Sequence, residues 1–248
     1  MTGQDGTVMA PSGDPAAITG LRSAAAVLWD IDGTLLLSGG IAARAFLDAV
    51  HDVTQVRPNP AGIDFGGRID PEIAALLLAA VGHDAGQVPA VLARLEERVQ
   101  ERAELLRSHT QALAGVGALL GRLADAGVRQ TVVTGNVRSV ALVKLAGAGV
   151  VPPIEPDVGG YGDSGPDRAE VARVALLQLF GPSWPTLARR CWIIGDTPRD
   201  LACAQALGLR CVLVGTGRHP AESLSGLGAD VVLSRLDDPD QVHDLWHG

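Results

Sequence analysis

The sequence VLWDIDGTL, residues 27–35, ends an apolar run in two carboxylates, Asp30 and Asp32, and then turns at Gly33. The apolar run is typical of a buried strand, and burying a charge is unfavourable unless the charge is paired or bound to a cation. Gly33 allows a sharp turn, and backbone N–H groups in such a turn can face an anion. The stretch therefore predicts a core strand that ends in a functional site.

Further apolar runs along the chain predict four more buried strands, at residues 129–135, 191–196, 210–215 and 229–234. Amphipathic helical patterns lie beside them, at residues 115–128, 137–150, 167–180 and 199–208. Continuously apolar strands that alternate with such helices indicate an α/β fold, with a Rossmann-like parallel sheet as its core. Because ligands bind beyond the carboxyl ends of such strands, we expect Asp30, Thr134 and Asp196 to lie together.

The segment after the first strand has a different pattern, with helical periodicity and no clear strand. It predicts an all-helical cap domain at residues 38–112, inserted into a catalytic core of residues 21–37 and 113–248. Residues 1–20 are expected to form a flexible tail. Within the cap, Asp70 is expected to cap the helix that begins at Pro71.

Composition and charge limit the kinds of partner and the cellular location that we expect for this chain. The net charge of −8 over 248 residues disfavours a nucleic-acid partner, which usually requires a basic face. The first twenty residues lack the features of a signal peptide, and no window is apolar enough for a membrane span. Three cysteines without close pairs indicate reduced thiols and a cytoplasmic protein. The sequence leaves the oligomeric state open.

The chemistry-bearing residues are carboxylates. DIDGT at residues 30–34 and GDTPRD at residues 195–200 supply four of them at or just after the ends of predicted strands. Carboxylate oxygens suit a hard cation, and we expect Mg²⁺, which binds through one or two carboxylates together with substrate phosphate. The six histidines show no metal-ligand spacing.

Three stretches, VLWDIDGTL, TVVTGN and IIGDTPRDLACAQALGL, resemble in this order the first, second and fourth motifs of the haloacid dehalogenase-like superfamily. The helical insertion is similar to the cap of its phosphoglycolate phosphatase and β-phosphoglucomutase branch. The resemblance implies a Mg²⁺-dependent enzyme that acts on a small phosphorylated metabolite through an aspartyl-phosphate.

The resemblance also implies roles for individual residues. Asp30 is the nucleophile, and Asp32 is the general acid and base. Residues implied to hold Mg²⁺ are Asp30, the backbone carbonyl of Asp32, Asp196 and Asp200. Residues implied to bind phosphate are Gly33, Thr134, Gly135, Asn136 and Arg168. Asp32 could instead only cap the turn, and Asp200 could only cap the following helix.

Arg168 marks a departure from the superfamily, whose third motif usually supplies a lysine that this sequence lacks at that point. Arg168 opens a predicted helix and is the best substitute, with Arg173 as the other cation there and a surface arginine as the alternative. Lys144, the only lysine of the chain, comes earlier and is expected to face solvent.

The cap sequence DFGGRID, residues 64–70, resembles a substrate-facing loop in which Arg68 would contact the leaving group. It could equally be a plain turn that leads into a helix. Hydrolysis of a small phosphate monoester is the function favoured overall, and a sugar phosphomutase is the main alternative. A 2-haloacid dehalogenase and a non-catalytic phosphate-binding protein are less favoured, and phosphonate cleavage through a cap lysine is excluded because the cap contains none.

Overall fold

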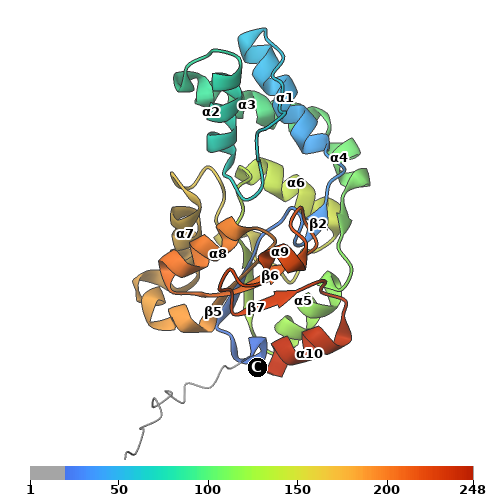
Figure 1. The fold of residues 1–248 in the computed structure, drawn as a ribbon, viewed down its shortest axis with the longest axis vertical. Helices are drawn as coiled ribbons and strands as arrows, with labels where there is room; N and C mark the ends of the chain where they lie inside the picture. Colours follow the sequence, from blue (N-terminus) through green and yellow to red (C-terminus); the bar gives the residue numbers. More distant parts are fainter. Residues whose placement is uncertain (1–19, 248) are drawn as a thin grey trace, which may run out of the picture.

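The computed structural model describes residues 20–247, and its core is a five-stranded parallel sheet (Figure 1). The strand order is β4-β1-β5-β6-β7, and every neighbouring pair is parallel. The strands are β1 (Ala26–Trp29), β4 (Arg129–Val132), β5 (Cys191–Gly195), β6 (Arg210–Val214) and β7 (Val231–Leu233). All five strands predicted from apolar runs are thus confirmed, as is the Rossmann-like α/β class.

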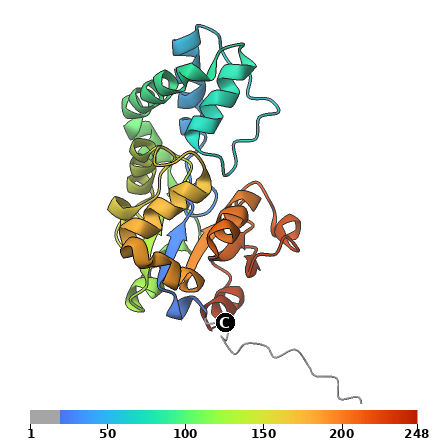
Figure 2. The ribbon, with the colours of Figure 1, turned by 90° about the vertical axis from the view of Figure 1, so that its left-hand side faces the viewer.

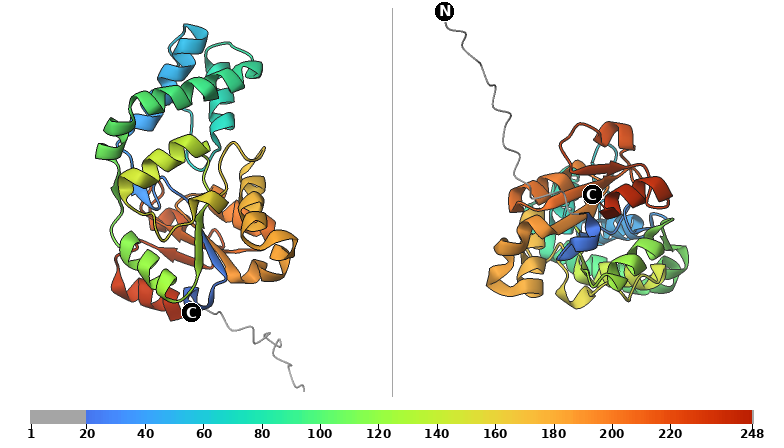
Figure 3. Two further views of the ribbon diagram at one scale, coloured as in Figure 1. Left: turned by 180° about the vertical axis from the view of Figure 1, so that it is seen from behind. Right: turned by 90° about the horizontal axis from the view of Figure 1, so that it is seen from below.

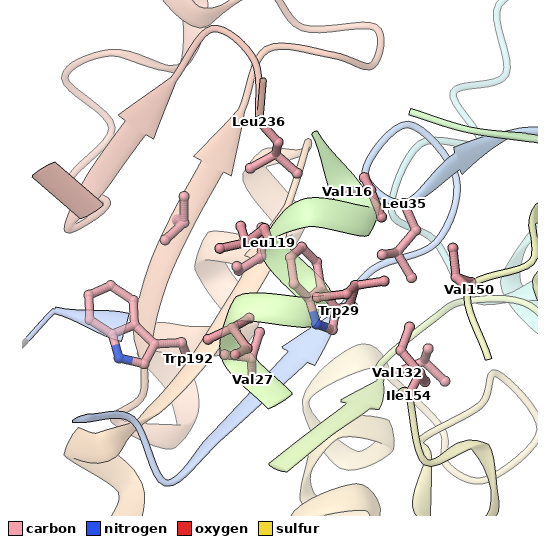
Figure 4. Packing of buried hydrophobic residues seen from close by; sticks show 14 of the residues in the cluster. Val27, Trp29, Leu35, Val116, Leu119, Val132, Val150, Ile154, Trp192 and Leu236 are labelled. Atoms are coloured by element: carbon pink, nitrogen blue, oxygen red, sulfur yellow. The ribbon is translucent and has the colours of Figure 1, made fainter. Parts of the chain in front are cut away.

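Helices cover both faces of this sheet because successive strand residues point to opposite sides. Val27 and Trp29 of β1 pack with α5 (Val116–Asp125), α6 (Arg138–Ala148) and α10 (Pro239–His247). Figure 4 shows this side, with Trp29 close to Leu119 and Val132. Ala26 and Leu28 pack on the other side with α7 (Arg168–Phe180), α8 (Pro198–Leu207) and α9 (Ala221–Leu224). The described 3₁₀ segments are η1 (Leu21–Ser23), η2 (Ala85–Gln87), η3 (Pro156–Val158) and η4 (Gly181–Arg190).

Four helices inserted after β1 form the cap: α1 (Ile41–Thr54), α2 (Asp70–Ala80), α3 (Val88–Glu101) and α4 (Ala103–His109). They enclose a hydrophobic cluster of their own, which also takes in Val137, Val140 and Val143 from the core. The cap lies above one end of the sheet (Figure 2), and α6 lies between the two (Figure 3). The all-helical cap predicted from the sequence is confirmed.

Two short strands join the cap to the core. β2 (Leu36–Leu37) and β3 (Gln111–Ala112) pair antiparallel in a separate two-stranded sheet. The sequence did not predict them, because two residues give no measurable alternation and their pairing spans the whole cap. They bring the two chain crossings between core and cap side by side.

The prediction that Asp70 caps its own helix is wrong. α2 begins at Asp70, but the side chain is buried and its Oδ2 accepts a hydrogen bond from the backbone N–H of Val137 at 2.8 Å. Its own N–H donates to the carbonyl of Gly135 at 2.7 Å. Asp70 therefore ties the cap to the first residues of the α6 region.

Of the tail predicted at residues 1–20, residues 1–19 lie outside the described part of the chain. Within the described part, no helix combines the length and the apolar character that crossing a membrane requires.

Candidate active site

Asp30 and Arg168 meet at the carboxyl end of β1. Asp30 follows the strand directly, and its backbone N–H donates to the carbonyl of Ile194. Arg168 is the first residue of α7 and is 8% exposed. Its Nη2 donates to Asp30 Oδ1 at 2.6 Å and to Asp200 Oδ1 at 2.5 Å. The alternative of a surface arginine is therefore wrong, and the structure brings Arg168 to the predicted nucleophile.

Asp196 and Asp200 complete a cluster of buried carboxylates at the end of β5. One oxygen from each of Asp30, Asp196 and Asp200 lies within 4.8 Å of the others. Asp200 is also the third residue of α8 and completes a capping box with the N-cap residue Thr197, since its Oδ2 accepts from the N–H of Thr197 at 3.0 Å and from its hydroxyl at 2.7 Å. Helix capping and membership of the cluster, weighed as alternatives for Asp200, coexist.

The three carboxyl groups of this cluster are buried together, and burial disfavours their charged form. Burial raises the pKa of Asp30 to about 7, and nearby Asp200 adds to the rise while Arg168 opposes it. Burial likewise raises the pKa of Asp196 to about 8, with further repulsion from Asp30 and Asp200. A cluster of buried oxygens that repel one another in this way fits a hard divalent cation such as Mg²⁺.

Glycines make room for this cluster. A Cβ at Gly33, whose φ is +87°, would lie 2.6 Å from Asp196 Oδ2. A Cβ at Gly217 would lie 1.6 Å from the same oxygen, so neither position accepts a side chain without rearrangement. The hydroxyl of Thr216 donates to the carbonyl of Gly33 at 2.6 Å. The sequence did not predict a role for the loop at residues 215–219, although Thr216, Gly217, Arg218 and His219 all line the cavity. One arginine and one histidine in a glycine-rich turn form no recognisable motif.

Thr134, Gly135 and Asn136 follow β4 and line the same cavity. Thr134 is buried, and its Oγ1 accepts a hydrogen bond from the N–H of Asn136 at 3.2 Å. A Cβ on Gly135 would lie 1.8 Å from the carbonyl oxygen of Arg68, so this glycine allows the cap loop to touch the core.

Lys144 corrects the expectation of a solvent-facing side chain, because it is only 3% exposed. Its Nζ donates to Asp32 Oδ2 at 2.5 Å and to Asn136 Oδ1 at 2.7 Å. The signal was present in the helix pattern: Val140 and Ala141, four and three residues earlier, are both buried. Lys144 shares their face.

The cap loop at residues 64–70 touches the fourth-motif segment. Arg199 Nη1 donates to Asp64 Oδ2 at 2.7 Å and to the carbonyl of Gly66 at 2.5 Å. Arg68 lines the cavity, while its Nε donates to the carbonyl of Asp64 at 2.9 Å. Of the two readings of this loop, the structure supports its position at the cavity.

A cavity of about 520 Å³ lies between the cap and the sheet end. Its polar lining from the core includes Asp30, Asp32, Thr134, Asn136, Lys144, Arg168 and Asp196. Its apolar lining from the cap includes Phe46, Phe65, Ile73 and Leu95. Asp200 is fully buried behind this wall, and Arg173 points elsewhere, since it pairs with Glu170 at 2.5 Å.

Comparison with known proteins places this geometry in a family. A family model described as haloacid dehalogenase-like hydrolase matches residues 27–205. A phosphoglycolate phosphatase from Rhodospirillum rubrum is 32% identical over 215 residues, covering 82% of this chain and 85% of the relative.

Solved structures agree on the fold. A hydrolase from Pseudomonas syringae has a TM-score of 0.66 at 17% identity, over 89% of this chain and 98% of its own. CbbY from Rhodobacter sphaeroides, solved in complex with phosphate, has a TM-score of 0.62 at 20% identity. The match covers 87% of this chain and 96% of the CbbY chain. The chain therefore belongs to the haloacid dehalogenase-like hydrolase family, as a phosphoric monoester hydrolase.

Proposed function

We propose that this protein is a Mg²⁺-dependent phosphatase that hydrolyses a small phosphate monoester through an aspartyl-phosphate on Asp30. The observation that carries the proposal is Asp30 itself, a carboxylate at the wall of the cavity that contacts Arg168 at 2.6 Å. The catalytic core comprises residues 21–37 and 113–248, and the cap comprises residues 38–112.

The carboxylate cluster is the proposed metal site. Asp30, Asp196 and the backbone carbonyl of Asp32 would hold Mg²⁺, with Asp200 directly or through water. When bound, the ion supplies positive charge for the phosphoryl oxygens and for the carboxylates. Within this cluster of three carboxylates Arg168 contacts Asp30 and Asp200, and one guanidinium cannot balance three negative charges.

The reaction divides into two displacements. The Asp30 carboxylate attacks phosphorus, the bond from phosphorus to the ester oxygen breaks, and Asp32 gives its proton to that oxygen. Asp32 then takes a proton from water, whose oxygen attacks phosphorus and releases inorganic phosphate from Asp30. Thr134, Arg168 and the backbone at Gly33, Gly135 and Asn136 bind the phosphoryl oxygens, which carry spread charge during transfer.

The substrate class follows from the relative and the cavity together. Phosphoglycolate is the leading candidate because of the 32% identical relative, and Arg68 at the cavity wall would contact an anionic or hydroxylated leaving group.

Reduced thiols support a cytoplasmic setting, since Cys191, Cys203 and Cys211 are all free and buried.

A substrate panel tests the proposal. Purified protein with Mg²⁺ is assayed against phosphoglycolate, sugar phosphates and nucleoside monophosphates, and release of inorganic phosphate is measured. Asp30→Asn should lower turnover by about 10⁴-fold or more, because a neutral amide is a poor nucleophile toward phosphorus. Beryllofluoride should form an adduct at Asp30. Phosphate release by the Asn variant at the normal rate would exclude the mechanism, and isomerised sugar phosphate in place of free phosphate would identify a mutase.

A further inference from the structure

Lys144 forms a network with Asp32 that the proposed reaction does not yet explain. Its Nζ donates to Asp32 Oδ2 at 2.5 Å and to Asn136 Oδ1 at 2.7 Å. The Lys144 side chain is 4% exposed, whereas that of Asp32 is 42% exposed. The pair therefore joins a buried cation on α6 to a carboxylate that is open to the cavity.

Burial gives this contact its strength. An ammonium group removed from water is unfavourable unless a counter-charge and further acceptors compensate. Asp32 supplies the charge and Asn136 supplies a second acceptor. If the Asp32 side chain adopted another rotamer, the buried Lys144 ammonium would keep only the amide oxygen of Asn136 as a partner at hydrogen-bond distance.

The two oxygens of Asp32 consequently differ. Oδ2 is held by Lys144, whereas Oδ1 accepts a long hydrogen bond of 3.4 Å from the hydroxyl of Ser38. Both Ser38 and Asp32 line the cavity. Oδ1 is therefore the oxygen that is less firmly held and available to exchange a proton with the leaving group.

We infer that Lys144 is a positioning residue: it fixes Asp32 through Oδ2 so that Oδ1 reaches the leaving-group oxygen. This inference rests on the proposed function, in which Asp32 gives its proton to the ester oxygen. In this scheme Lys144 acts on the leaving-group side only. Arg168, which contacts the proposed nucleophile Asp30, acts on the phosphoryl side.

The inference predicts a dependence on the leaving group. An alkoxide needs a proton as it departs, whereas p-nitrophenolate is stable as an anion and needs little help. Displacing Asp32 should therefore lower kcat/KM, which covers the steps up to departure of the leaving group, much more for alkyl phosphates than for p-nitrophenyl phosphate. Hydrolysis of the aspartyl-phosphate, in which Asp32 takes the proton from water, is common to both substrates and does not enter kcat/KM. A residue that merely supports the fold would slow both substrates by the same factor.

The test measures kcat and KM for phosphoglycolate, or the best alkyl phosphate of the panel, and for p-nitrophenyl phosphate. Lys144→Met should lower kcat/KM by about 10²-fold on the alkyl phosphate, in the range of general acid catalysis, with a much smaller change in kcat/KM on p-nitrophenyl phosphate. Lys144→Arg should recover part of kcat/KM on the alkyl phosphate. Lys144→Gln serves as a second variant if the Met variant does not fold.

Asp32→Asn is the matched control. It should show the same leaving-group dependence, and the double variant with Lys144→Met should be no slower than Asp32→Asn alone. Equal losses of kcat/KM on both substrates, or additive losses of kcat/KM in the double variant, would each overturn the inference.

Thermal unfolding without Mg²⁺ gives a readout that does not depend on activity. Asp32→Asn should lower the melting temperature, because it leaves the buried ammonium without its counter-charge, and adding Lys144→Met should recover part of that loss. Additive melting shifts would contradict the pairing.

The proposed function and this inference can fail separately. An active Asp30→Asn variant would refute the proposed function whatever Lys144 does. An inactive Asp30→Asn variant, together with equal losses of kcat/KM on both substrates in the Lys144 variants, would refute only the inference.

Discussion

Arg168 and Lys144 are both buried cations at one cavity, but the carboxylates that they contact differ in solvent exposure. Arg168 lies between Asp30 and Asp200, which are 8% and 0% exposed in their side chains, so that network is buried throughout. Lys144 contacts Asp32, whose side chain is 42% exposed. An almost fully buried network fixes charge in place, whereas the more exposed Asp32 is left free to exchange protons. In the proposed mechanism, Arg168 would thus belong to the part of the cavity that binds the phosphoryl group, and Lys144 to the part that handles the leaving group.

Removing the metal is the strongest way to test the charge balance around Arg168. One guanidinium cannot neutralise three buried carboxylates, so turnover should vanish in EDTA and return with Mg²⁺, while Ca²⁺ should inhibit because it favours more ligands. Asp196→Asn should raise the Mg²⁺ concentration needed for half-maximal turnover. Phosphate release measured across a Mg²⁺ titration checks both expectations. Full turnover in EDTA would mean that Arg168 suffices and that the cluster holds no ion.

Replacing Arg168 tests the buried network directly. Arg168→Ala should lower turnover by about 10²–10³-fold, the usual loss when one preorganised donor is removed. Arg168→Lys should recover part of the rate, because the charge is kept while the guanidinium, whose Nη2 contacts both Asp30 and Asp200, is lost. Turnover of p-nitrophenyl phosphate is the measurement.

Arg173→Ala is the matched control, since Arg173 lies on the same helix and pairs with Glu170 at the surface. Its turnover should stay normal. A normal rate in Arg168→Ala with collapse in Arg173→Ala would reverse the assignment of the two arginines.

The smallest expected effect is on stability, and it comes from the titration of Asp70. Burial raises its pKa to about 7, against a usual value of 3.8, with Lys144 opposing the rise and Asp32 and Asp163 adding to it. Between these two pH values the folded protein binds more protons than the unfolded chain, so stability falls as pH rises through this window.

Asp70→Asn removes this titration while its amide oxygen can still accept from the N–H of Val137. The variant should therefore melt higher than the parent protein at pH 8, and the difference should shrink as pH falls toward 5. Melting temperatures of both proteins across this range provide the check. A difference that is constant with pH would show that Asp70 is not protonated on folding.

Sequence patterns predicted the sheet, the cap and the carboxylates, because each depends on local periodicity or on residues that follow a strand. Arg168 was found from the order of the motifs. The prediction for Lys144 is wrong because a lysine charge usually indicates solvent exposure, whereas this lysine lies on the buried face of α6. Asp70 was misplaced because a local capping rule competed with a contact 67 residues away, to the N–H of Val137. Partners at such separations depend on tertiary packing, which no local pattern encodes.

The paired strands β2 and β3 make the cap a long insertion into a hairpin. Leu37 lies opposite Gln111, so the two ends of the insertion are neighbours and the core need not stretch to accommodate it. Because closure entropy grows slowly with loop length, such a position tolerates inserts of very different size. Joining Leu37 to Gln111 by a two-residue turn would in principle leave a minimal core. That core would expose Val140 and Val143, the side chains of α6 that the cap now covers, so a replacement cap must bring its own apolar face to this helix.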